Sequence, residues 1–141
     1  MTVPGWEAHL PAGVRAGDLD LVAKGSLPAA WASVWGSIPS KPTLFDQERG
    51  WISAAELEDG SRRVAGRLQA AGLEPGDRML FSAESSCALV IAHVAALRSG
   101  IVVIPTNTAY REREIAHIVT DAGPKAALVD DDARAQRVRP G

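Results

Sequence analysis

The chain has 141 residues, of which 46% are hydrophobic and 23% are charged, and its net charge is −2 at pH 7. These values are typical of one globular domain or a piece of a larger one. They show no excess of positive charge of the kind that binds nucleic acid. The single cysteine excludes an intrachain disulfide, and the apolar runs are too short to span a membrane, so we expect a cytoplasmic protein.

Residues 1–25 mix proline, glycine and charge without a sustained period, so we expect an extended N-terminal arm, docked by Trp6 and Leu10. A helix is expected to begin at Ser26, because a capping serine followed by Pro28 is typical of a helix N-terminus. The apolar residues predicted to share one face of this helix are Trp31, Val34 and Trp35.

Two short apolar segments, residues 43–46 and 51–52, flank a polar turn at residues 47–50, which predicts a β-hairpin. Ser53 and Glu56 then have the spacing of a capping box, which opens a second helix. This helix is amphipathic, with charged residues expected to point away from an apolar stripe. The stripe consists of Leu57, Val64, Leu68 and Ala71, and the charged residues are Glu58, Arg62 and Arg63.

The rest of the chain alternates strands with helices. Strands are predicted at residues 78–82, 101–104 and 126–129, and helices at residues 85–98 and 111–122. The helix at residues 85–98 is apolar almost all round, which indicates cover on both sides, and strand 101–104 lacks alternation, as expected inside a parallel sheet. The predicted fold class is α/β, a doubly wound and mainly parallel sheet with helices on both faces. Three strands leave exposed edges, so the fold is expected to be incomplete.

Motifs for phosphate binding and acid–base catalysis are mostly missing. No glycine-rich phosphate loop occurs, and residues 123–125 (Gly-Pro-Lys) lack the Ser/Thr/Gly run that would present backbone amides to a phosphate. His9, His93 and His117 form no constellation, and His93, inside an apolar helix, is interpreted as a structural histidine.

Three other features have both a chemical and a structural interpretation. Cys87 near a helix N-terminus has the setting for a lowered pKa, but a small buried thiol is favoured. The acidic residues 130–132 suggest either a Mg²⁺ site or a solvated turn, and the turn is favoured. The tryptophans interpreted as core and staple residues are Trp31, Trp35 and Trp51. We therefore assign no catalytic residue and no metal site.

Several short motifs occur together in a specific order. They are Trp51-Ile52-Ser53 with Glu56-Leu57, residues 72–78 (Gly-Leu-Glu-Pro-Gly-Asp-Arg), residues 96–100 (Ala-Leu-Arg-Ser-Gly), Pro105 with Asn107, Glu114-Ile115, and residues 121–125 (Asp-Ala-Gly-Pro-Lys). In this order and spacing they resemble the N-terminal region of the AMP-forming acyl-CoA synthetases, an adenylating superfamily that also includes luciferases and peptide-synthetase adenylation domains. The resemblance covers residues 27–130, and it implies that residues 26–141 are the first, truncated part of the large N-terminal domain.

The resemblance implies a much longer ligase that uses ATP, Mg²⁺ and CoA. Such enzymes convert a carboxylic acid into an acyl-adenylate and pass the acyl group to the CoA thiol. The family's phosphate loop, its Tyr-Gly-Thr-Glu segment, its ribose-binding Asp and its catalytic Lys are absent from these residues. We therefore expect the chain alone to be inactive and to bind none of these cofactors, and we expect no nucleic-acid partner and no membrane span.

The resemblance is compatible with more than one acid substrate. A fatty acid is favoured, but the motifs at residues 97–100 and 105–110 resemble malonyl-CoA synthetase-like members equally well. Residues 83–86 (Ala-Glu-Ser-Ser) and Thr108 depart from the family's commonest pattern. A non-catalytic α/β binding or interaction module is the alternative of another class. Homo-oligomerisation, the role of residues 1–25, and whether the truncation is natural stay open.

A polar turn follows strand 101–104, at the end of the strand where open α/β sheets place ligands. Pro105 has no N–H group and is expected to end the ladder of sheet hydrogen bonds, after which Asn107 or Thr108 turns the chain. The resemblance implies that this turn lies at the mouth of the channel through which CoA approaches. The residues predicted to border CoA there are Thr108, Ala109, Tyr110 and Arg111, with Arg111 meeting a phosphate.

Overall fold

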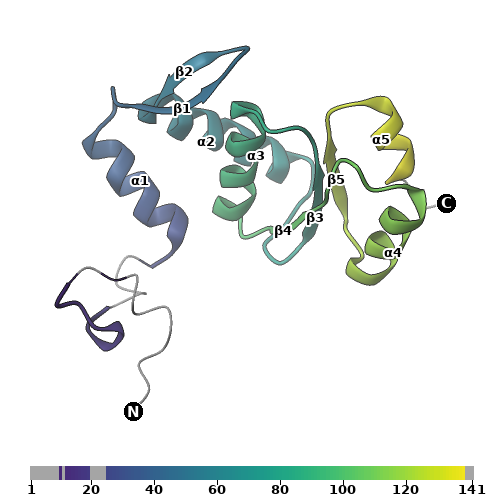
Figure 1. Ribbon diagram of the computed structural model, residues 1–141, viewed down its shortest axis with the longest axis horizontal. Coiled ribbons are helices and arrows are strands. Elements are labelled where there is room, and N and C mark those ends of the chain that lie inside the picture. Colours follow the sequence, from purple (N-terminus) through teal and green to yellow (C-terminus); the bar gives the residue numbers. More distant parts are fainter. Residues whose placement is uncertain (1–9, 11, 20–24, 139–141) are drawn as a thin grey trace.

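The computed structural model describes residue 10, residues 12–19 and residues 25–138 (Figure 1). Of the predicted arm, Trp6 lies outside the described residues, Leu10 is half-buried, and Ala16–Asp18 forms one 3-10 turn (η2). Within the described part of the chain, no helix has the length and apolarity needed to cross a membrane.

The first helix, α1 (Leu27–Ser37), begins as predicted at Ser26, whose hydroxyl accepts a hydrogen bond from the Ala29 N–H at 3.3 Å. Trp31 and Trp35 stack with their ring centroids 5.9 Å apart, and Trp35 is buried. Val34, which was predicted to share their face, is 47% exposed. Residues three and four apart are neighbours on a helix surface, so Val34 lies beside Trp31 but at the solvent-exposed border of that face.

Strands β1 (Pro42–Asp46) and β2 (Gly50–Ser53) form the predicted antiparallel hairpin, with Phe45 opposite Trp51. Trp51 is not a core residue as predicted, because it is 64% exposed, and Phe45 is 57% exposed. Neighbouring residues of a strand point to opposite faces, so the buried Ile52 turns Trp51 outward. The hairpin therefore carries an exposed aromatic pair, with ring centroids 5.4 Å apart.

Helix α2 (Ala54–Ala70) opens with the predicted capping box. The Ser53 N–H donates to the Glu56 carboxylate at 2.8 Å, and the Glu56 N–H donates to the Ser53 hydroxyl at 3.3 Å. Leu57 is buried as expected, but Ala71 lies beyond the helix and is exposed. Glu58 was expected to face away from the core; instead it forms an ion pair with Arg98.

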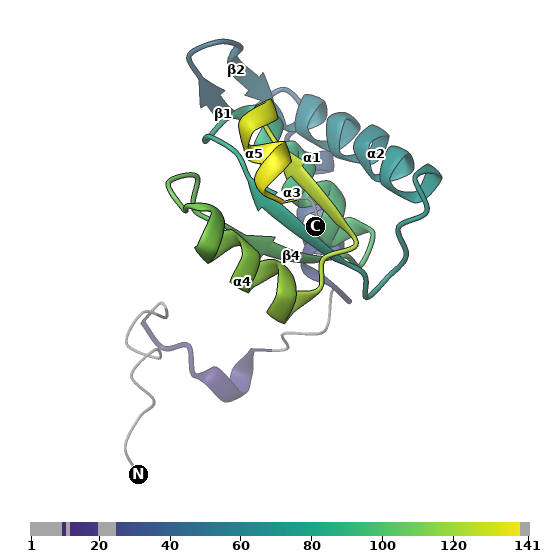
Figure 2. The same ribbon diagram turned by 90° about the vertical axis from the view of Figure 1, so that its right-hand side faces the viewer.

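The sheet consists of β3 (Arg78–Ser82), β4 (Val102–Pro105) and β5 (Ala126–Val129), all parallel, in the order β4-β3-β5. Helices α2 and α3 (Cys87–Arg98) lie on one face, and α4 (Glu112–Ala122) and α5 (Asp132–Arg137) lie on the other (Figure 2). The doubly wound α/β fold is therefore confirmed. Strand β4 is at an edge rather than inside the sheet, and its Val102 is half-exposed.

Helix α3 lies between two hydrophobic clusters, which confirms that its all-round apolarity reflects cover on both sides. Ile91 and Val94 belong to the cluster that α3 shares with α1, α2 and the hairpin. Ala92 and Ala96 belong to the cluster that it shares with α2 and the sheet. This central helix therefore fixes the position of the hairpin relative to the carboxyl ends of the strands.

Candidate functional site

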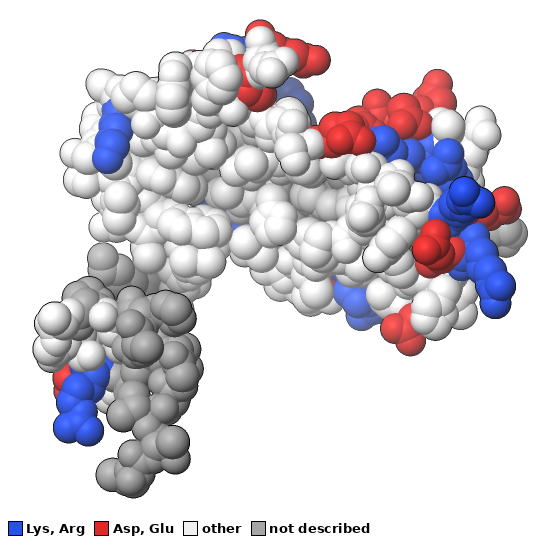
Figure 3. Space-filling model, in the orientation of Figure 1, with Lys and Arg blue, Asp and Glu red and all other residues white. Residues whose placement is uncertain are grey.

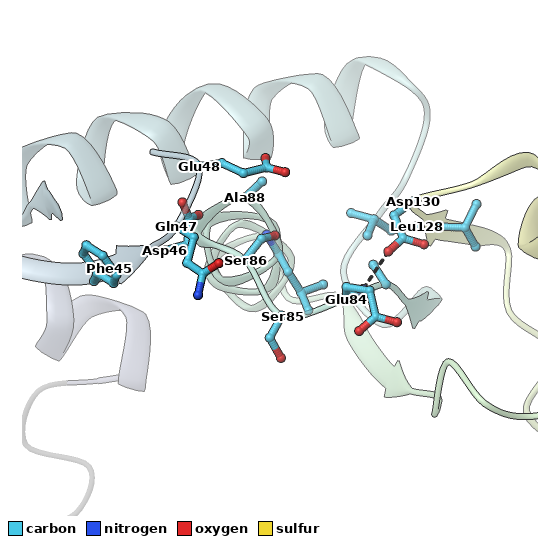
Figure 4. Close-up of a pocket in the computed structure, with 13 residues that line it drawn as sticks. Phe45, Asp46, Gln47, Glu48, Glu84, Ser85, Ser86, Ala88, Leu128 and Asp130 are labelled. Atoms are coloured by element: carbon cyan, nitrogen blue, oxygen red, sulfur yellow. Dashed lines mark hydrogen bonds between the residues drawn. The ribbon is translucent and has the colours of Figure 1, made fainter. Parts of the chain in front are cut away.

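A groove of about 950 Å³ opens at the carboxyl ends of β3 and β5 (Figure 4). One wall is the turn of the β1–β2 hairpin, and the opposite wall combines the β3–α3 loop with the end of β5. The lining residues are Phe45, Asp46, Gln47, Glu48, Ala83, Glu84, Ser85, Ser86, Ala88, Leu89, Leu128, Val129 and Asp130. Sequence reasoning missed this groove, because its three segments are far apart in the chain and none carries a motif.

The charges that line the groove are all negative: Asp46, Glu48, Glu84 and Asp130, with no Lys or Arg among the lining residues. The Asp46 carboxylate accepts the backbone N–H groups of Arg49 at 2.6 Å and Cys87 at 2.7 Å. These hydrogen bonds lower the pKa of Asp46. The groove therefore keeps a negative charge at neutral pH.

The Asp130 carboxylate accepts the Glu84 backbone N–H at 2.7 Å, the contact drawn in Figure 4, and this hydrogen bond lowers the pKa of Asp130. Arg134 of α5 binds the carboxylates on this side of the groove. Its guanidinium pairs with Glu84 at 3.0 Å, with Asp130, and with Asp131 at 3.4 Å. One cation thus holds the β3–α3 loop against the end of β5.

Residues 130–132 are exposed, as predicted for a solvated turn, although Asp132 already belongs to α5 and two of the carboxylates have structural partners. Asp130 binds the Glu84 N–H and Arg134, and Asp131 caps α5 by accepting the Arg134 N–H at 2.7 Å. Over the described residues, no group of three or more His, Cys, Asp or Glu side chains is arranged to hold a metal ion. Helix α5 was not predicted, although the Asp131 cap is the signal that would have indicated it.

The polar turn after β4 is held by its own side chains. Asn107 accepts the Ala109 N–H through its side-chain oxygen at 2.8 Å, as predicted. Strand β4 and its register with β3 end at Pro105, as predicted, although the Thr106 N–H still donates to the Phe81 carbonyl at 2.8 Å. Alternate residues of a strand bond to opposite sides, so the missing N–H of Pro105 falls on the outer edge of β4.

Two of the predicted rim residues, Thr108 and Tyr110, pack against α5 and its flanking Val138. They share a small gap with Ser82, Ile115, Arg134, Arg137 and Val138. Arg137 donates to the Tyr110 carbonyl at 3.4 Å, so the fold adds a guanidinium to this turn that sequence reasoning missed. Arg111 lies apart from that gap, exposed at the N-terminus of α4, where its N–H donates to Glu114 at 2.8 Å.

The other candidate residues have structural surroundings. Cys87 is buried, and burial together with the neighbouring Asp46 raises the pKa of its thiol, so the buried-thiol interpretation is confirmed. His93 packs edge-on against Phe81, with ring centroids 5.8 Å apart. The Lys125 ammonium donates to the Gly72 carbonyl at 2.9 Å and to Asp77 at 2.7 Å, which ties the end of α2 to the start of β5.

Comparisons with known proteins agree on one family. The family described as AMP-binding enzyme matches residues 32–141. A fatty acid–[acyl-carrier-protein] ligase, ScoC of Streptomyces coeruleorubidus, is 30% identical over 94 residues, which cover 67% of this chain and 18% of that protein. The medium-chain fatty-acid–CoA ligase of Escherichia coli is 25% identical over 100 residues, which cover 71% of this chain and 18% of that ligase.

A solved structure supports the same relationship. The N-terminal subdomain of Klebsiella oxytoca NpsA superposes with a TM-score of 0.74 at 27% identity, covering 82% of this chain and 29% of that one. The chain therefore spans about a fifth of the length of the two curated relatives and less than a third of this solved subdomain.

Proposed function

Because the chain belongs to the AMP-binding enzyme family, whose members are adenylate-forming ligases, we propose that residues 26–141 are the first part of an acid–CoA ligase. The complete enzyme would join a carboxylic acid to AMP from ATP with release of pyrophosphate, and the CoA thiol would then displace AMP from the acyl group. The family match over residues 32–141 is the observation that carries this proposal.

The acid that we propose is a fatty acid. Two of the relatives bear names that specify fatty-acid substrates, one with an acyl carrier protein and one with CoA as the acceptor. A small acid such as malonate remains the second candidate, on the motifs at residues 97–100 and 105–110. In either case the acid-binding pocket would lie in segments other than these.

The described residues do not fit the triphosphate of ATP or its Mg²⁺. The groove at the carboxyl ends of β3 and β5 carries four carboxylates, which would repel phosphate oxygens. Two of these carboxylates, Asp46 and Asp130, are already engaged by backbone N–H groups. We therefore assign no step of adenylation to this part of the chain, and ATP would bind to other segments of the complete enzyme.

For CoA, we propose that Thr108, Ala109, Tyr110 and Arg111 border the channel by which it enters. Support comes from the exposed guanidinium of Arg111 and from Arg137 at the Tyr110 carbonyl, which give the turn two cations. Guanidinium groups bind phosphate oxygens in a bidentate way, and CoA carries three phosphates. The polar turn and the acidic groove thus suit different ligands.

The Arg111→Ala substitution tests this rim in the polypeptide encoded by the complete reading frame, called here the complete polypeptide. We expect the apparent KM for CoA to rise about tenfold, since one charge-assisted phosphate contact is lost, while acid-dependent adenylation is unchanged. Arg63→Ala removes an exposed cation of α2 and serves as the matched control. An unchanged CoA dependence of Arg111→Ala would contradict the rim.

Mass spectrometry of the thioester product tests the proposed function itself. The complete polypeptide is incubated with ATP, Mg²⁺, CoA and one acid at a time: octanoate, palmitate, malonate or salicylate. We expect octanoyl- or palmitoyl-CoA as the main product. Malonyl- or salicyl-CoA as the main product would contradict the fatty-acid assignment, and acyl-adenylates formed without any thioester would contradict CoA as the acceptor.

A further inference from the structure

The groove at the carboxyl ends of β3 and β5, called here the acidic groove, is lined by both acidic and apolar side chains. Its apolar lining residues are Phe45, Ala83, Ala88, Leu89, Leu128 and Val129. Acidic side chains stand on both sides of the hollow between the hairpin and α5 (Figure 3). A ligand that combines apolar surface with positive charge would therefore suit this lining.

A smaller depression adjoins the groove. It shares Phe45, Asp46, Ser85 and Ser86 with the groove and is also lined by Leu44, Cys87 and Val90. Phe45 and Val90 are both exposed, although large apolar side chains at this position would gain free energy from burial. The depression therefore adds Leu44, Cys87 and Val90 as apolar lining next to the groove.

The walls keep their charge and their position. Asp46 and Asp130 are each fixed by backbone N–H groups, and Arg134 holds Glu84 beside Asp130. Glu48 is exposed on the hairpin turn, and among the described residues it has no ion-pair partner. Because the walls are already ordered, binding of a cationic ligand would not cost the entropy of ordering their side chains.

Other ligand classes fit this shape less well. A phosphate-bearing cofactor would meet four carboxylates of its own sign. A metal ion fits poorly, because over the described residues no group of three or more His, Cys, Asp or Glu side chains is arranged to hold one. A polypeptide segment with Lys or Arg beside apolar residues matches both the acidic and the apolar lining of the groove.

We propose that such a basic, apolar segment occupies the acidic groove, and that it comes from another part of the same polypeptide. This source rests on the proposed function, in which residues 26–141 belong to a longer ligase. The relatives in which this region occurs are much longer, since the matched residues make up 18% of ScoC. The groove is therefore a contact surface inside the complete enzyme, and not its nucleotide site.

Peptide binding followed by nuclear magnetic resonance tests the proposal. The isotope-labelled 141-residue chain is titrated with a short amphipathic peptide of leucine and lysine, and with a matched peptide of leucine and glutamate. We expect the lysine peptide alone to shift backbone signals of residues 45–48, 83–89 and 128–130, and binding to weaken in high salt. Equal binding of both peptides, or shifts elsewhere, would overturn the groove as the site.

Charge reversal gives the matched comparison. Glu48→Lys changes a wall residue that has no described ion pair, and we expect it to weaken binding of the lysine peptide about tenfold. Asp59→Lys makes the same charge change on the exposed surface of α2, outside the groove, and should leave binding unchanged. Equal losses in both variants would mean that only net charge matters, which would overturn the groove.

The complete polypeptide tests the source of the segment. If its own segment fills the groove, the lysine peptide should not bind it, although the peptide binds the 141-residue chain. Binding of equal strength to both would overturn the intramolecular source. Thioester formation by the complete polypeptide is measured separately, so failure of the groove proposal and failure of the proposed function give different results.

Discussion

Four carboxylates, two in loops, one at the end of β1 and one in the first turn of α2, accept hydrogen bonds from backbone N–H groups. Asp77 accepts the Glu74 N–H and Glu56 accepts the Ser53 N–H. Asp46 and Asp130 do the same across long sequence separations, to Cys87 and Glu84. Each of these carboxylates has a pKa below its ordinary value, which couples the stability of the fold to pH.

Asp77 gives the clearest pH test. The Lys125 ammonium and the Glu74 N–H lower its pKa in the folded chain, so ionised Asp77 contributes stability above its unfolded pKa of about 3.9. That contribution is lost as the pH falls through the folded pKa. We expect Asp77→Asn to lower the thermal unfolding midpoint at about pH 6 and to lower it less at about pH 3, which is below the unfolded pKa.

Asp59→Asn is the control for this measurement, because Asp59 is an exposed carboxylate of α2. It should leave the unfolding midpoint almost unchanged at both pH values. If Asp77→Asn lowers the midpoint equally at both, the effect comes from packing and not from the charge of Asp77.

Two glycines should respond to alanine with opposite signs. Gly100 has φ +71°, and a Cβ there would lie 3.1 Å from the Pro75 Cβ, so Gly100→Ala should destabilise the fold by about 1–2 kcal/mol. Gly66 lies on the exposed side of α2 with nothing within 4 Å of a Cβ, so Gly66→Ala should stabilise it by about 0.5–1 kcal/mol. Denaturant unfolding measures both. Destabilisation by Gly66→Ala would show that α2 does not have the described exposed face.

At the scale of the elements, helix α3 makes contacts of two kinds. It packs against two hydrophobic clusters, and its Arg98 forms an ion pair with Glu58 of α2. Arg98 donates to both carboxylate oxygens of Glu58, one of them at 3.0 Å, and the two side chains are about four-fifths buried. A paired, two-point contact of this kind fixes the relative position of two helices more strongly than an exposed ion pair does.

A double-mutant cycle measures this contact. We expect Arg98→Met and Glu58→Gln each to destabilise the fold by about 1–2 kcal/mol, because each leaves a partly buried charge without its partner. The double variant should cost clearly less than the sum of the two, with a coupling free energy of about 1 kcal/mol. Additive costs in denaturant unfolding would mean that the pair contributes nothing beyond the packing of its side chains.

Most of the elements could be predicted because they depend on local signals, and η2 and α5 are the exceptions. The caps Ser26 and Ser53, the 3.6-residue period of α2 and the all-round apolarity of α3 are visible in the sequence. Neighbours far along the chain decide which side chains are exposed or paired. Val34 and Trp51 are exposed, and Glu58 forms an ion pair with Arg98. The acidic groove could not be predicted for the same reason, because only the tertiary fold joins its walls.

At the scale of the whole molecule, the described residues form a sheet of three parallel strands with two open edges and helices on both faces. The family match and the superposed NpsA subdomain both extend over most of this chain and over only a minor part of the relatives. On the proposed function, the groove and the polar turn would belong to a surface that other segments of the ligase complete. This interpretation makes adenylation a property of the complete polypeptide.

Acid-dependent exchange of labelled pyrophosphate into ATP tests that claim most directly, because it detects the acyl-adenylate without requiring CoA. The 141-residue chain and the complete polypeptide are assayed side by side with octanoate, palmitate, malonate and salicylate. We expect exchange by the complete polypeptide with at least one of these acids and only background exchange by the 141-residue chain. Clear exchange by the chain alone, or none by the complete polypeptide with any acid, would contradict the account.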